Sequence, residues 1–163
     1  MEKKIIKKFG NRLRVRVCGI LIERNKLLLV KHRGLGKEGI LWAPPGGGME
    51  FGANAKENLQ REFFEETGLK VVIKRFLFVH EYLDSPLHSI ELFFEVERVG
   101  GHLIKGNDPE MEGEDQIIEA VEFLNIETIG RQKPSTLHYI LRNKEEISKL
   151  LEQSGYFSFE IFT

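Results

Sequence analysis

The sequence has little cysteine, no long apolar run and no excess of charge of either sign. Cys18 is the one cysteine among 163 residues, so the chain can form no internal disulfide and offers no cysteine pair for a zinc site. The N-terminus lacks the apolar core of a signal peptide, and no apolar run approaches the ~20 residues that span a bilayer. These absences predict a soluble protein of the reducing cytoplasm, without a membrane partner.

The balance of charge excludes a second group of functions. The chain carries 24 Lys and Arg against 25 Asp and Glu, for a net charge of -1. Without an overall positive field, nothing draws the chain as a whole to nucleic acid, and no pair of DNA-binding helices is apparent. The five histidines are scattered and form no His-Glu-x-x-His motif, which argues against a zinc site. We therefore expect no nucleic-acid partner.

Composition and periodicity predict one domain. Hydrophobic residues make up 41% of the chain and charged residues 30%, as in an ordinary globular domain, so we expect residues 1–163 to form a single domain. Alternation of apolar and polar residues, or runs rich in β-branched and aromatic residues, indicate strands. The expected strands are 12–22, 26–33, 71–83, 89–99, 117–124 and a last one within 156–163. Gly100 and Gly101 favour a hairpin.

A helix is predicted over residues 55–67. Asn54 followed by Glu57 resembles a capping box, in which each of the two side chains accepts a hydrogen bond from the other's backbone N–H. Gly68 is well placed to end the helix, because glycine readily adopts the left-handed conformation of a helix terminus.

Two further helices are expected in the C-terminal part of the chain. A short helical turn is predicted near 126–131, and Pro134 opens a helix at about 134–152. The order of two strands, helix, strands and helix indicates the α/β or α+β class, with helices packed on a twisted sheet.

Three carboxylates lie together on one face of the helix at 55–67. Glu62, Glu65 and Glu66 have the spacing i, i+3 and i+4, and Glu66 lies only about 20° in azimuth from Leu59, so this face borders the apolar stripe. A solvated charged face would lie opposite that stripe. The like charges are unfavourable unless a divalent cation lies among them. Carboxylates, waters and phosphate oxygens are the ligands of Mg²⁺, and Mn²⁺ would fit similarly.

A glycine-rich loop directly precedes the acidic helix. Residues 34–52 contain two prolines and the run "PPGGG" at 44–48. Gly46, Gly47 and Gly48 let backbone groups approach a ligand without interference from a Cβ atom. The loop is not a P-loop, because no Lys-Ser or Lys-Thr follows at the required spacing.

Together, the loop and the helix resemble the box of the Nudix hydrolases. That box reads Gly, five residues, Glu, seven residues, Arg-Glu, an aliphatic or aromatic residue, any residue, Glu-Glu, any residue, Gly, then an apolar residue. From Gly47 to Leu69 every position matches except Ala53, which stands where the family has its first Glu. The preceding "LWAPPGG" is similar to the family's usual lead-in. The resemblance implies an α/β/α sandwich with a mixed β-sheet flanked by helices.

The resemblance also implies an activity, the hydrolysis of a nucleoside diphosphate linked to another group, X. By similarity, Glu62, Glu65 and Glu66 would hold the divalent metal with a loop carbonyl of Gly46 or Gly47, and Arg61 would orient the glutamates. Glu62, Glu65 and Arg61 are therefore the catalytic candidates from the box, and the expected partner is a nucleotide-derived diphosphate.

Ala53 motivates an alternative hypothesis, a Nudix-fold nucleotide sensor with little catalysis. The missing Glu supports the loop and the arginine of the box in the family. Glu50 or Glu57 could compensate, but Glu57 is already explained as the capping partner of Asn54.

Further candidates lie outside the box. The acidic stretch "DPEMEGED" (108–115) could supply a general base, and we select Glu114, against the alternative of a solvated turn. Arg33, with His32, precedes the glycine loop and could contact phosphate or be an unpaired exposed side chain. Trp42 could stack on a base, and Gly46 and Gly47 could contact the substrate through their backbone. The aromatic C-terminal segment either extends a sheet into a homodimer or closes its own core.

Overall fold

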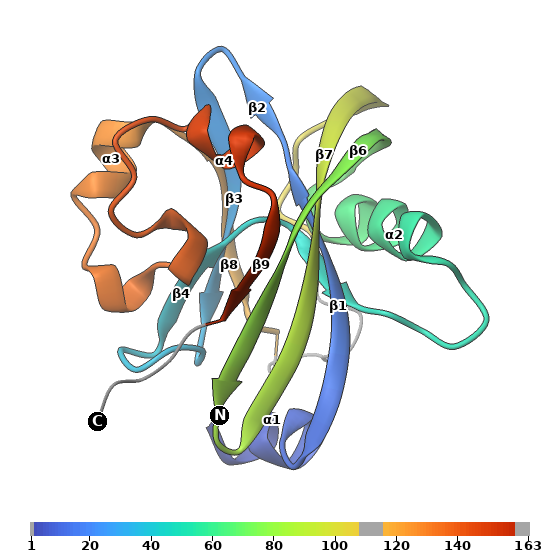
Figure 1. Cartoon of the computed structure of the whole chain (residues 1–163), viewed down its shortest axis with the longest axis vertical. Helices are drawn as coiled ribbons and strands as arrows, with labels where there is room; N and C mark the ends of the chain where they lie inside the picture. The colour runs from blue at the N-terminus through green and yellow to red at the C-terminus, as the bar shows by residue number, and fades with distance from the viewer. Residues whose placement is uncertain (1, 108–115, 159–163) are drawn as a thin grey trace.

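The computed structural model describes residues 2–107 and 116–158, and these form a mixed α+β fold with two sheets flanked by helices (Figure 1). The strands are β1 (Arg12–Ile20), β2 (Ile22–Glu23), β3 (Lys26–Arg33), β4 (Ile40–Ala43), β5 (Gly46–Gly48), β6 (Leu69–Asp84), β7 (Leu87–Gly101), β8 (Ile118–Leu124) and β9 (Gly155–Ser158). The helices are α1 (Glu2–Phe9), α2 (Ala55–Thr67), α3 (Ile126–Gly130) and α4 (Lys149–Glu152), with 3-10 turns η2 (Pro134–Thr136) and η3 (Tyr139–Leu141).

The larger sheet is mixed. Its order within the described residues is β5-β1-β7-β6-β9. Strand β1 pairs in parallel with β7, whereas β6 and β7 form a long antiparallel hairpin that turns at Ser85 and Pro86. Strand β9 pairs in parallel with β6 of the same chain, so residues 155–158 extend the chain's own sheet. The smaller sheet has the order β2-β3-β4, with β8 also paired to β3.

Two apolar clusters lie on opposite sides of the larger sheet. Figure 1 shows α2 on one side of this sheet and the C-terminal segment on the other. Leu59 and Phe63 of α2 are fully buried in the first cluster, against β1, β6 and β7. Phe78 and Phe93 stack with ring centroids 4.7 Å apart in the second. Burying apolar area on both sides of the sheet supplies the main stabilisation of the fold.

The bounds and caps of α2 confirm the prediction for residues 55–67. The Asn54 side chain accepts a hydrogen bond from the Glu57 backbone N–H at 3.0 Å, and Glu57 accepts one from the Asn54 N–H at 2.9 Å. Gly68 ends the helix in the left-handed conformation, with φ 72°. Local signals suffice here because every one of these contacts lies within the helix and its termini.

The predicted helix at about 134–152 is wrong. The segment contains the two short 3-10 turns η2 and η3 and the four-residue helix α4. The His138 N–H donates to the Trp42 carbonyl at 2.9 Å, and Leu137 forms a bridge with Trp42 in β4, so the sheet takes backbone groups that a helix would use internally. Asn143 then adopts a positive φ of 56°, which is incompatible with a continuous helix.

Two other expectations also need correction. Gly100 and Gly101 do not form a hairpin turn, because β7 continues through both and pairs them with Lys70 and Leu69. The predicted glycine-rich loop at 34–52 contains the two short strands β4 and β5, and the glycines of β5 pair with β1. Within the described residues, none of the helices has the length and the apolar run that crossing a membrane would require.

Candidate active site

A cleft of about 810 Å³ opens beside α2 and the glycine loop. Its walls come from β1, β5, α2, β7 and the segment around η3. Among the residues that line it are Arg16, Gly46, Gly47, Glu62, Glu66, Glu91 and His138. The cleft is large enough for a drug-sized ligand, and its floor carries both carboxylates and cations.

The acidic face of α2 meets the glycine loop at the floor of this cleft. Glu62 and Glu66 are only 4% and 3% exposed, whereas Glu65 is half-buried. Glu66 accepts a hydrogen bond from the Gly46 backbone N–H at 2.9 Å. A Cβ atom on Gly47 would lie 2.3 Å from the carboxylate of Glu62, so the loop approaches this acid more closely than any other residue type would permit.

Arg61 is the cation that holds this face together. Its guanidinium lies 2.9 Å from Glu62, 2.8 Å from Glu65 and 3.5 Å from Glu50, and it also donates to Asn58. Because Glu57 serves in the capping box, Glu50, 3.5 Å from Arg61, is the better candidate to compensate for the Glu that Ala53 replaces.

We expect Ala53→Glu to leave nucleotide binding similar and to raise the turnover rate, because the added carboxylate would give Arg61 a further anchor. The matched background is Glu50→Gln, which should lower turnover by about tenfold if Glu50 acts in place of the missing Glu. Steady-state kinetics of the two single variants and the double variant test this. A lower rate in Ala53→Glu would mean that the loop is built around alanine.

Glu62 carries an unusual charge state. Burial, and then repulsion by Glu66, raise the pKa of Glu62 from its ordinary value of 4.5 to about 7, although the neighbouring Arg61 lowers it. The folded chain therefore holds a proton on Glu62 at pH values where a solvated glutamate would have lost it. A divalent cation relieves the same repulsion, so the carboxylate oxygens fit a hard metal ion.

The structure places Trp42 and Arg33 outside this cluster and His32 next to it. Trp42 is 7% exposed and packs in the apolar core, so we no longer consider it a base-stacking residue. Arg33 is exposed and donates to the Gln116 carbonyl at 2.7 Å. His32 is buried, with its Nε2 atom 3.8 Å from Glu66. Glu114, selected as a general base, lies outside the described residues.

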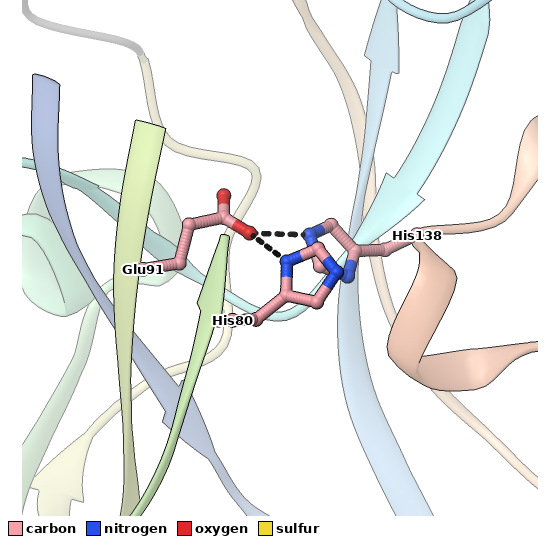
Figure 2. A group of neighbouring side chains, drawn as sticks. All are labelled: His80, Glu91 and His138. Atoms are coloured by element: carbon pink, nitrogen blue, oxygen red, sulfur yellow. Dashed lines mark hydrogen bonds and ion pairs between the residues drawn. The ribbon is translucent and has the colours of Figure 1, made fainter. Parts of the chain in front are cut away.

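Sequence reasoning missed a second group of polar residues, His80, Glu91 and His138, of which Glu91 and His138 line the cleft and His80 is buried beside them. Figure 2 shows the three side chains converging from two strands and the C-terminal segment. Oε2 of Glu91 lies 3.0 Å from His80 Nδ1 and 2.8 Å from His138 Nε2. Arg16 Nε lies 3.4 Å from the other carboxylate oxygen. The histidines are far apart in sequence, so no short sequence motif predicts this group.

The buried Glu91 is held in its charged form. Burial alone would raise its pKa, but the attraction and hydrogen bond of His138, the hydrogen bond of His80 and the charge of Arg16 together hold the pKa of Glu91 well below its usual range. A buried carboxylate is tolerated only when donors surround it in this way.

A helix whose buried acids face a glycine loop, on a mixed sheet flanked by helices, defines a protein of the Nudix fold. A solved NUDIX hydrolase from Nitrosomonas europaea superposes with a TM-score of 0.64 at 17% identity, over 86% of this chain and 87% of that one. This likeness concerns the fold.

The family follows from the sequence comparisons. The model of the NUDIX domain matches residues 11–143, and the chain therefore belongs to the NUDIX family. An ADP-ribose pyrophosphatase of Methanocaldococcus jannaschii is 36% identical over 112 residues, 66% of each chain. An 8-oxo-dGTP diphosphatase of Buchnera aphidicola is 36% identical over 78 residues, which are 48% of this chain and 58% of the relative. The matches thus span just under two thirds of the first relative and less of the second.

Proposed function

We propose that the chain is a divalent-metal-dependent pyrophosphohydrolase that cleaves a nucleoside diphosphate linked to another group. The observation that carries this proposal is the burial of Glu62 and Glu66 against the backbone of Gly46 and Gly47. Carboxylates in this position cost stability unless they bind something positive, and the adjoining cleft has room for a nucleotide. The names of the two relatives make ADP-ribose and oxidised nucleoside triphosphates the first substrates to test.

Glu62, Glu65 and Glu66, with the Gly46 carbonyl, would hold Mg²⁺ or Mn²⁺. The bound metal would polarise phosphoryl oxygens and lower the pKa of an attacking water. Arg61 keeps Glu62 and Glu65 in place through the contacts described above. Without the metal, Glu62, with its pKa of about 7, can hold a proton near neutral pH, and metal binding would displace this proton. Glu114 stays our prediction for a general base outside the box.

A panel of substrates tests the proposal. The chain, with Mg²⁺, is mixed with ADP-ribose, nucleoside triphosphates, sugar nucleotides and dinucleoside polyphosphates, and the release of nucleoside monophosphate is measured. We expect hydrolysis of at least one compound, and its loss on chelation of the metal. Tight binding of a nucleotide without turnover of any compound would instead support the alternative, a nucleotide sensor, which Ala53 favours.

A further inference from the structure

Arg16 projects from β1 into the cleft between the acidic helix and Glu91. Its side chain is 25% exposed. Nη2 donates to the Gly46 carbonyl at 3.2 Å. Nε is buried 3.4 Å from Glu91, yet it has no hydrogen-bond partner within the part of the chain that the structure describes. The Nε edge of the guanidinium thus faces Glu91 and its Nη2 atom faces Gly46, so the group is fixed at the wall of the cleft.

Glu91 forms an ion pair with Arg16, and hydrogen bonds with His80 and His138 fix the position of Glu91. His138 Nδ1 accepts a hydrogen bond from the Ile140 N–H at 3.4 Å, so in the neutral ring the proton lies on Nε2 and is donated to Glu91. The carboxylate of Glu91 therefore keeps its charge next to Arg16 while its other oxygen is fixed by His80 and His138.

The same three residues are close enough to share a metal ion, with their ligand atoms within 4.8 Å of one another. The hydrogen bonding opposes that role. A metal on His138 Nε2 would move the ring proton to Nδ1, where it would face the N–H of Ile140. Arg16 would add a second positive charge beside the metal. The group is better suited to anchoring a cation than to binding one from solution.

We infer that Arg16 binds the phosphate groups of the substrate, and that Glu91 is the residue that positions Arg16 for this contact. This inference rests on the proposed function. Guanidinium is always charged at physiological pH, and its planar fork matches phosphate oxygens. Glu62 and Glu66 lie within electrostatic range of Arg16, and an anion entering next to these acids needs a fixed cation as well as the metal. The Gly46 carbonyl has two lone pairs, so its bond to Arg16 leaves one for a metal.

Binding of the α,β-methylene analogue of ADP tests the role of Arg16. A carbon replaces the bridging oxygen of this analogue, so calorimetry with Mg²⁺ measures its affinity without turnover. We expect Arg16→Gln to raise the Kd by about 10- to 100-fold, as for a lost hydrogen bond to a charged group. Arg16→Lys keeps the charge but not the fork, and should raise Kd by a smaller factor. Arg98→Gln, which removes an exposed guanidinium paired with Glu23, should leave Kd unchanged.

A double-variant cycle tests the role of Glu91. Glu91→Gln should raise the Kd of the analogue in the wild-type background but have no further effect in Arg16→Gln, because Glu91 acts through Arg16. Circular dichroism at the temperature of the titration establishes that each variant is folded. A Glu91→Gln effect that persists without Arg16 overturns the positioning role.

The outcomes separate this inference from the proposed function. An unchanged Kd in both Arg16 variants, with an analogue that binds the wild-type chain, overturns the inference alone. A wild-type chain that neither binds the analogue nor hydrolyses any panel substrate overturns both. A wild-type chain that binds the analogue but hydrolyses none of the panel substrates overturns the proposed enzyme, whereas the variants still decide what Arg16 does.

Discussion

Glu62→Gln is expected to lower turnover by about a hundred- to a thousandfold and, without metal, to stabilise the folded chain at pH 8. The loss of turnover follows because the amide removes a negative ligand from the site of charge stabilisation. The gain in stability follows from the pKa of Glu62, which burial and Glu66 raise from 4.5 to about 7. Since the folded state binds this proton more tightly than the unfolded state, stability decreases as the pH rises from 4.5 through 7.

Glutamine imitates the protonated acid, so the variant escapes that decrease. A pKa raised from 4.5 to about 7 corresponds to a gain of at most about 3 kcal/mol in the free energy of unfolding at pH 8. Urea unfolding in a chelator at pH 5 and pH 8 measures it, and the gain should shrink at pH 5, where the wild-type residue is itself protonated. Mg²⁺ should then stabilise the wild-type chain at pH 8 more than the variant.

Glu65→Gln is the matched control. Glu65 lies on the same helical face and also pairs with Arg61, but its side chain is 31% exposed. We expect it to lose metal binding and hydrolysis together without the gain in stability at pH 8. If Glu62→Gln instead destabilises the metal-free chain at pH 8, Arg61 stabilises the charged carboxylate of Glu62 by more free energy than burial and Glu66 cost it.

The parts of the fold that could be predicted from the sequence are those specified by neighbours in the chain. Helix α2 was predictable because Asn54, Glu57 and Gly68 carry its caps within the helix and its termini. The segment after Pro134 shows the opposite case. Its apolar residues repeat as in a helix, but its backbone bonds to Trp42, a residue distant in sequence, and this pairing prevails over the local pattern.

The site divides in the same way. Glu62, Glu65 and Glu66 lie within about one turn of a helix, so their shared face follows from helical geometry. His80 and Glu91 are paired across the β6–β7 hairpin, which becomes apparent only once the turn is placed at Ser85 and Pro86 rather than at later glycines. No local signal places His138 beside them, because its position depends on how the C-terminal segment packs across the sheet.

Gly46→Ala and Gly47→Ala change adjacent positions, but the first should lose stability and the second should lose turnover. A Cβ atom on Gly46 would lie 2.0 Å from the Val17 carbonyl oxygen and 2.7 Å from the Cys18 Cα atom, and Gly46 has a φ of 152°. Neither the backbone of β1 nor this conformation can adapt to a side chain. We therefore expect Gly46→Ala to lower the free energy of unfolding by at least about 3 kcal/mol.

A Cβ atom on Gly47 would instead meet the end of a side chain, the Glu62 carboxylate, at 2.3 Å. That side chain can rotate away at little cost in stability, but the acid then leaves its place at the cleft. Gly47→Ala should therefore stay folded, with a change in unfolding free energy below about 1 kcal/mol, and lose turnover by about a hundredfold. Thermal unfolding and kinetics of both variants measure this contrast. A Gly47→Ala chain with wild-type turnover would mean that the reaction does not depend on where the loop holds Glu62.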